Sequence, residues 1–284
     1  MKGTRTFLPL ALLLGLGCTH TEVARPEPAK TSGGEPVSQP TEAAGHNMWH
    51  HFWDIADARD AVIAGRLDLV AAPLQRIVDT KYGVDELPQD WIPWVEEMQA
   101  QAKLGIEAKT LGAAATAVAS VAQACGDCHR STRGGPEIEN DLKAFDAHGR
   151  TGLKGAMAQH VWAAEQLWLG MTAPHHQSWA AGAQALASTP LPPAKDDNDE
   201  SEAADEEDGT ADDPPAETAP TSAAVPAAQP TGEPIDADMH AKLEAVRSMG
   251  DAALAAGQPA QMAHVYGELI ARCGACHASM HVGK

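Results

Sequence analysis

Two copies of one short cysteine and histidine motif constrain this chain more than any other feature. Residues 124–131 read ACGDCHRS and residues 272–279 read RCGACHAS. In each copy two cysteines stand three positions apart, and a histidine follows the second cysteine directly. The two copies contain four of the five cysteines in the chain, so chance is a poor explanation for them.

The histidine separates three chemistries that share this cysteine spacing. In a covalent haem site both thiols bond to the haem vinyl groups, and the adjacent histidine becomes the proximal iron ligand. A thioredoxin-like pair needs no histidine and expects a βαβ context, which this alanine-rich chain lacks. A zinc site expects cysteine pairs roughly 15 to 20 residues apart, whereas these pairs lie 148 positions apart. Disulfides or metal thiolates remain the alternative to two haem c groups, whose predicted anchors are Cys125, Cys128, His129, Cys273, Cys276 and His277.

The first 18 residues have the layout of a signal peptide. Lys2 and Arg5 precede an apolar run from Phe7 to Leu16, which is too short to span a membrane. The segment ends in Gly-Cys and resembles a bacterial lipoprotein signal, in which Cys18 would be lipidated and become the mature N-terminus. Ordinary cleavage nearby is the alternative. Because haem is attached covalently outside the cytoplasmic membrane, we expect a periplasmic or cell-envelope protein, anchored to the membrane through Cys18.

A flexible tether and two repeats are expected after the signal peptide. Residues 19–45 are rich in Pro, Thr and Glu, a composition typical of linkers. The segment that begins at Met48 matches the one that begins at Met157 at an offset of 109, whereas the segments that end in the two motifs match at an offset of 148. The second repeat therefore contains an insertion, which we assign to residues 190–235.

Acidic residues dominate this insertion. From Asp196 to Glu217 there are 12 acidic residues and no Lys or Arg, so of the formal net charge of -19 only -19 + 12 = -7 belongs to the rest of the chain. Because its apolar residues show no periodicity, the insertion is expected to be a disordered loop, acting as a solvating spacer or docking a basic redox partner. A net negative chain without a basic, aromatic-laced patch argues against nucleic-acid binding.

Apolar residues at steps of three and four predict four helices in each repeat. Strand signals are nearly absent. The expected fold is all-α, with one four-helix bundle at residues 46–135 and a second at residues 154–284, joined by a short linker. The first helices are expected to start near Met48 and Met157, and the fourth to end in the two motifs. In the first repeat the second and third helices should cover roughly Leu67–Asp79 and Gln89–Lys109. In the second repeat they should cover roughly His175–Ser188 and Asp236–Ala256.

A motif of this kind at the end of a long helix resembles the cytochrome c′ family, whose four-helix bundles carry C-x-x-C-H near the end of the fourth helix. The resemblance covers roughly residues 46–133 and 154–281. The family has a basic residue four places beyond the histidine. Arg133 fills that place in the first repeat, whereas the second repeat departs from the pattern with His281 there instead. The resemblance implies one covalent haem in each bundle. Such proteins often form dimers through their first helices, so the two repeats are expected to pair with each other or with a second copy.

The second axial ligand of each iron is expected from the first helix of the same repeat. In an up-down-up-down bundle the start of the first helix and the end of the fourth lie at the same end. His51 and His160 occupy matching positions there on an apolar stripe, so they are predicted as distal ligands opposite the proximal histidines. Met48 and Met157, one turn earlier, are the alternative, as is an iron without a second protein ligand.

The coordination of the irons decides the expected function. Two six-coordinate irons leave no open site for a substrate, so what remains is reversible one-electron transfer with other redox proteins, which is not an enzyme activity. Open, five-coordinate irons would instead bind nitric oxide or carbon monoxide. A dihaem peroxidase would need a polar acid and base beside a vacant iron, and Arg59 and Glu165 have no counterparts in the other repeat.

Overall fold

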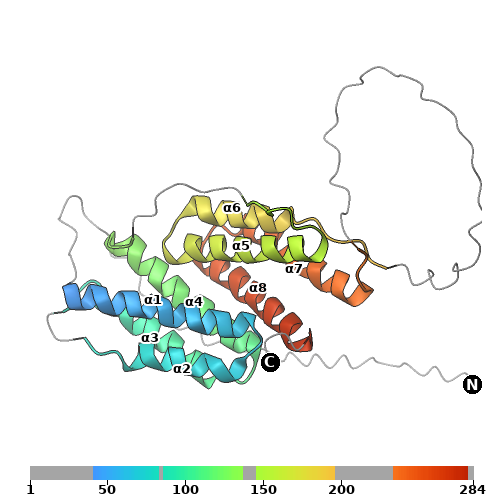
Figure 1. The fold of residues 1–284 in the computed structure, drawn as a ribbon. Coiled ribbons are helices and arrows are strands. Elements are labelled where there is room, and N and C mark those ends of the chain that lie inside the picture. The colour runs from blue at the N-terminus through green and yellow to red at the C-terminus, as the bar shows by residue number, and fades with distance from the viewer. Residues whose placement is uncertain (1–40, 83–85, 137–144, 196–232, 281–284) are drawn as a thin grey trace, which may run out of the picture.

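The computed structural model of the chain describes residues 41–82, 86–136, 145–195 and 233–280. These residues form eight α-helices and no strand, which confirms the all-α prediction (Figure 1). The expected signal peptide, the lipidation site Cys18, most of the tether and residues 196–232 of the acidic insertion lie outside the described residues. Over the described ranges, no helix combines the length and apolar character needed to cross a membrane.

The eight helices form two groups of four that follow the two repeats. In each group the helices pack in a ring, since α1 and α3 both contact α2 and α4, and α5 and α7 both contact α6 and α8. The bounds of the helices are α1 (Glu42–Ile63), α2 (Leu67–Asp79), α3 (Ile92–Glu107), α4 (Leu111–Thr132), α5 (Gly152–Thr172), α6 (His176–Ala187), α7 (Ala237–Ala255) and α8 (Pro259–Met280).

Helix α1 begins at Glu42, ahead of the predicted start of the first bundle at residue 46. The side chain of Thr41 accepts a hydrogen bond of 3.2 Å from the main-chain N–H of Ala44. This N-cap satisfies one of the donors that the first turn of a helix leaves free. The acidic Glu42 in the first turn also favours a helix start, because the N-terminal end of a helix carries a partial positive charge. The end of the expected tether is therefore helical.

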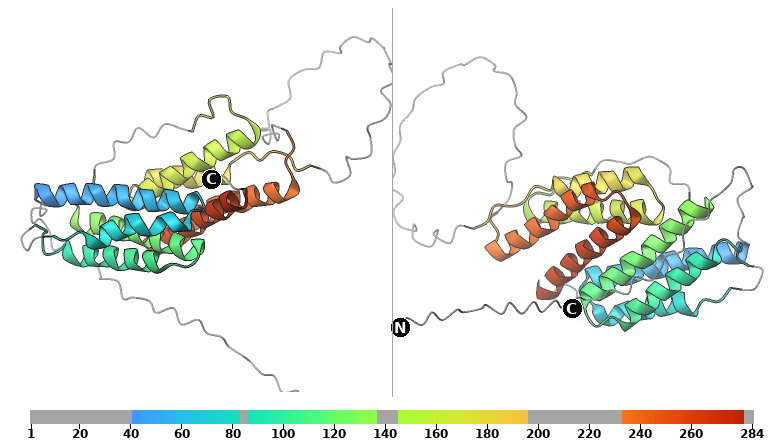
Figure 2. Two further views of the ribbon diagram at one scale, coloured as in Figure 1. Left: turned by 60° about the horizontal axis from the view of Figure 1, so that its bottom comes forward. Right: turned by 180° about the vertical axis from the view of Figure 1, so that it is seen from behind.

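The two groups dock through α4 and α8, which lie side by side where the groups meet (Figure 2). A Cβ built on Gly267 of α8 would lie 3.4 Å from the Cβ of Ala119 in α4. These two residues are equivalent at the offset of 148, so the same position of each repeat faces the other, as at a two-fold interface. Additional contacts join α1 to α8 and α4 to α5. The sequence left this pairing within one chain open.

A main-chain bridge closes the base of the acidic insertion. The N–H of Lys195 donates to the carbonyl of Ile235 at 2.8 Å, and the N–H of Ile235 donates to the carbonyl of Pro193 at 2.9 Å. The bridge between Ala194 and Ile235 is parallel. Two parallel segments cannot be joined by a tight turn, because the chain has to run back along them before the second segment begins. A shortened insertion therefore still needs a linker of several residues.

Replacing residues 196–232 with a flexible Gly/Ser linker of about ten residues should leave the fold intact. Shortening a loop roughly fourfold changes its closure entropy by only about 1 kcal/mol, and the bridge that positions both ends is retained. We expect an unchanged far-ultraviolet circular dichroism spectrum and a free energy of unfolding within about 1 kcal/mol of the parent chain. Loss of helical signal on this replacement would show that residues 196–232 take part in the fold.

Candidate functional site

A cavity of about 450 Å³ lies between α1, α3 and α4. Its wall brings together all four predicted site residues of the first repeat, Cys125, Cys128, His129 and His51. Leu169, Thr172 and Ala173, which belong to the second repeat, complete the wall. A concave and mostly apolar space of this size is typical of a ligand or cofactor site. Most of its remaining lining is apolar or aromatic and consists of Met48, Trp49, Phe52, Ile55, Trp91, Trp94, Val95 and Met98.

A second cavity, of about 270 Å³, lies between α5, α7 and α8. It brings together the site residues predicted for the second repeat, Cys273, Cys276, His277 and His160. The first repeat contributes Arg59, Asp60 and Ile63 of α1 to its wall. Each motif thus lines the same cavity as the predicted distal histidine of its own repeat, and each cavity is completed by the other repeat. The remaining lining of the second cavity includes Met157, Val161, Ala164, Leu243, Val246 and Leu269.

The histidine of each motif is held in the form that suits a metal ligand. Nδ1 of His129 lies 2.8 Å from the carbonyl oxygen of Thr172, and Nδ1 of His277 lies 2.7 Å from that of Ile63. A carbonyl oxygen only accepts hydrogen bonds, so Nδ1 must carry the proton in both rings. The lone pair is therefore on Nε2, the nitrogen with which such a ring binds a metal.

The predicted distal histidines are buried and neutral. His51 is 2 % exposed and His160 is 5 % exposed. Burial lowers the pKa of each imidazole to about 4, so neither ring carries a charge at pH 7. Nε2 of each ring is buried and lacks a hydrogen-bond partner among the described residues. Buried polar atoms in native proteins nearly always have a partner, and both orphan nitrogens belong to residues that line the two cavities.

Tyr82 holds the ring of His51, and the sequence had not indicated this contact. The Tyr82 hydroxyl lies 3.2 Å from Nδ1 of His51 and 4.0 Å from the sulfur of Met48. If the hydroxyl donates to the sulfur and accepts from Nδ1–H, both contacts are satisfied and the lone pair of His51 is on Nε2. Tyr82 is one of two tyrosines in the chain and follows α2 in a connection without helical periodicity, so no pattern placed it at the cavity.

Burial disfavours the thiolate form of the four motif cysteines. It raises the pKa of Cys125 and Cys273 to about 12 and that of Cys128 to about 11, and it raises the pKa of Cys276 as well. All four are free thiols. A dithiol redox pair works through a thiolate with a lowered pKa, so these environments oppose thioredoxin-like chemistry. Within the described ranges no three side chains of His, Cys, Asp or Glu gather to hold a bare metal ion.

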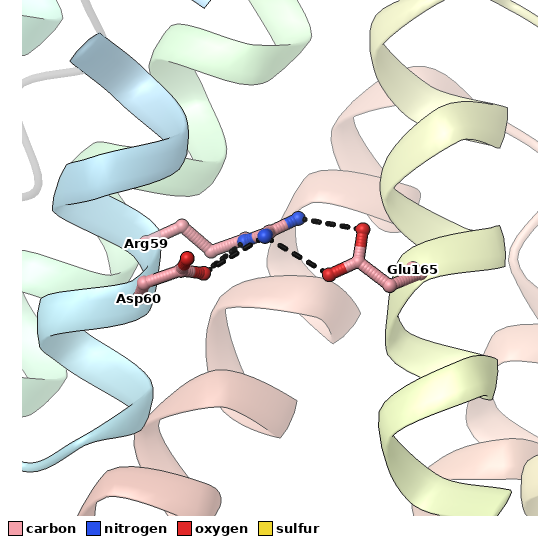
Figure 3. Close-up of polar contacts among 3 residues, drawn as sticks. All are labelled: Arg59, Asp60 and Glu165. Atoms are coloured by element: carbon pink, nitrogen blue, oxygen red, sulfur yellow. Dashed lines mark hydrogen bonds and ion pairs between the residues drawn. The ribbon is translucent and has the colours of Figure 1, made fainter. Parts of the chain in front are cut away.

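An ion pair across the repeats borders the second cavity. The guanidinium of Arg59 contacts both carboxylate oxygens of Glu165, at 2.9 and 3.1 Å, and Asp60 accepts two further hydrogen bonds (Figure 3). Arg59 is only 7 % exposed, and its guanidinium lies 5.0 Å from the ring centroid of Trp168. Arg59 and Glu165, which have no counterparts in the other repeat, thus pair with each other, a contact that the sequence had not indicated.

Comparisons with protein-family models, with curated proteins and with solved structures found no match to this chain. Its function is therefore inferred from the chemistry of the two cavities.

Proposed function

We propose that this chain is an exported dihaem c-type cytochrome that transfers one electron at a time. The observation that carries the proposal is the buried Nε2 of His51 and of His160, one in each cavity, for which the described part of the chain offers no hydrogen-bond partner. Leaving such a nitrogen unsatisfied costs about 1–3 kcal/mol. The iron of a haem bound by the motif in the same cavity would be the missing partner. That iron would then have two histidine ligands.

The residues of each cavity divide the work of holding a haem. Cys125 and Cys128 in the first cavity, like the equivalent thiols in the second, would form the two thioether bonds. The motif histidine would hold the iron through Nε2, and His51 or His160 would supply a second ligand. When bound, haem supplies reversible one-electron exchange at its iron. The apolar walls would exclude water, so less solvent would have to reorganise when the charge of the iron changes.

Methionine ligation is a close variant of this proposal. Met48 lines the first cavity and Met157 lines the second, so each sulfur is available in the same space as the distal histidine. Methionine would give a higher potential than histidine but the same carrier function. The contact between the Tyr82 hydroxyl and Met48 favours histidine in the first cavity, because it engages the sulfur elsewhere.

A gas-binding role for the second haem is the alternative that one observation favours. Among the described residues His160 has no hydrogen-bond partner to hold its ring, whereas His51 has Tyr82. A less restrained imidazole is more easily displaced from iron by nitric oxide or carbon monoxide. A peroxidase role is less favoured, because both oxygens of Glu165 already accept from Arg59 and an acid-base step would break that pair.

Export completes the proposal. The expected signal peptide and the lipid anchor on Cys18 would place the protein in the periplasm or at the cell envelope, attached to the membrane, where haem is attached to such motifs. Its partners would be other redox proteins. Labelling of the cells with a radioactive fatty acid should mark the parent chain, and Cys18→Ala should abolish the label.

The mature protein should carry the mass of two covalently bound haems after acid-acetone extraction. Replacing both Cys125 and Cys128 with Ala should remove one haem and leave the second repeat loaded, because each cavity has its own complete set of anchors. Cys273→Ala with Cys276→Ala should do the reverse. A parent chain whose intact mass contains no haem, or only one, would contradict the proposal.

A further inference from the structure

Each repeat supplies the hydrogen-bond acceptor for the proximal histidine of the other repeat. His277, at the end of α8, donates to the carbonyl of Ile63 in α1, and His129, at the end of α4, donates to the carbonyl of Thr172 in α5. Ile63 and Thr172 are equivalent at the offset of 109, as the histidines are at 148. The same contact is therefore built twice, with the roles of the repeats exchanged.

The two acceptors are special because they end a helix. Ile63 and Thr172 are the last residues of α1 and α5, where carbonyls have no partner within the helix. In α1 the three preceding carbonyls accept main-chain N–H groups from the turn that follows, and Ile63 accepts from His277 instead. The C-terminal end of a helix also carries a partial negative charge, which makes this carbonyl a stronger acceptor for an imidazole N–H.

Glycine in the motif makes this approach possible. Gly274 and Gly126 follow the first cysteine of each copy, and a Cβ on them would overlap the carbonyl oxygens of Val62 and Met171 respectively. These carbonyls precede the two acceptors by one residue. The shared glycine of ACGDCH and RCGACH is thus explained by the helix end of the other repeat that lies against it, and not by haem attachment, which tolerates any residue there.

We propose that docking of the two repeats sets the reduction potential of both irons, with Ile63 and Thr172 as positioning residues that act through the proximal histidines. The inference rests on the proposed function. A hydrogen bond from Nδ1–H raises the basicity of the ligating nitrogen. A more basic ligand stabilises ferric iron, so each contact lowers the potential of the haem in the repeat that donates it. A change in one repeat must therefore alter the haem of the other.

Gly65→Ala tests this cross-repeat effect. Gly65 belongs to the first repeat, but a Cβ on it would lie 2.7 Å from the carbonyl oxygen of Gly274 and 2.9 Å from the Cβ of Ala278, both in α8. The substitution should push α8 away from the end of α1 and lengthen the bond from His277 to Ile63. We expect the potential of the second haem to rise by up to about 59 mV, which corresponds to about a tenfold change in the ferric to ferrous ratio. The potential of the first haem should stay unchanged.

The two potentials are measured in the full dihaem protein by following the paramagnetically shifted haem methyl resonances through a redox titration. His51→Ala and His160→Ala assign the resonances to the two haems. Gly112→Ala is the matched control, because it is also a glycine of the first repeat but has nothing within 4 Å of an added Cβ. It should shift neither potential.

Two outcomes would overturn the inference while leaving the proposed function intact. One is an unchanged second haem in Gly65→Ala, and the other is an equal or larger shift of the first haem. Gly65 has a φ of 72°, so Ala also strains the turn. If that variant does not fold, Gly65→Asn adds bulk with a residue that tolerates this conformation, and the same result is expected. Failure of the proposed function would appear earlier, as a missing haem mass.

Discussion

His51→Ala should convert the first haem from a low-spin iron that binds carbon monoxide poorly into an open iron that binds it rapidly and stoichiometrically. His51 is the buried imidazole of the first cavity, and its Nε2 has no hydrogen-bond partner within the described ranges. Alanine would offer iron no ligand. His160→Ala should do the same for the second haem. Optical spectra of the ferric, ferrous and carbon monoxide-treated proteins measure both changes, and each variant should alter half of the haem signal.

Exposed histidines of the same helices or repeats provide the controls. His50 precedes His51 on α1 but is exposed and contacts His46, and His264 of α8 is exposed beside Glu268. Alanine at either position should leave the spectra unchanged. Rapid and stoichiometric carbon monoxide binding by the unmutated ferrous protein would contradict distal ligation and favour the gas-binding role.

Methionine variants separate the two possible ligands. If Met48→Ala and Met157→Ala open the irons while the histidine variants do not, the ligand is methionine sulfur. The ferric protein would then show the long-wavelength absorption band of a sulfur bound to haem iron. Either ligand retains the electron-transfer function, because the iron is six-coordinate in both cases.

Gly126→Ala and Gly274→Ala should each destabilise the folded protein by about 1–2 kcal/mol. An added Cβ would overlap the carbonyl oxygen of Met171 or Val62, and a main-chain atom inside a helix is unable to rotate away. Forced overpacking typically costs about 1–3 kcal/mol, while exchanging Gly for Ala within a helix returns up to about 1 kcal/mol. Denaturant unfolding of the pair of variants measures the net loss.

Gly112→Ala is the matched control for the two motif variants. It lies in α4, the helix that also contains Gly126, but an added Cβ would contact nothing within 4 Å. We therefore expect no loss of stability and a gain of up to about 1 kcal/mol from helix propensity. If Gly126→Ala behaved like Gly112→Ala, the close docking of α5 against the first motif would be wrong.

Much of the secondary structure was predictable from local patterns. The second helix was expected at Leu67–Asp79 and α2 spans those residues, because its apolar positions repeat with the helical period. The third helix of the second repeat was expected at Asp236–Ala256, and α7 covers Ala237–Ala255 with Asp236 as its N-cap. The start of α1 was missed by about six residues, Met48 against Glu42, because a cap depends on one side chain, Thr41, and not on periodicity.

The residues of the candidate site were also named by spacing and repeat position. Two thiols and a histidine in one helical turn face the same side of α4 or α8, and His51 and His160 hold one position in the repeat. The structure brings these residues together in two cavities, one for each repeat. The contact of Tyr82 with His51 was not predicted, because Tyr82 lies in a connection whose course is set by the helices that it joins.

The sequence by itself determined the helices, the repeat and the two cysteine and histidine motifs, since each depends on neighbours within a turn or on identical motifs. Tertiary structure alone decided how the repeats meet. Contacts of Ile63 with His277 and of Arg59 with Glu165 join residues 214 and 106 positions apart. No local pattern encodes such pairs, because they depend on which helix faces fit closely enough to exclude water. The small side chains of α4 and α8 permit that fit, and through it each repeat contacts the motif histidine of the other.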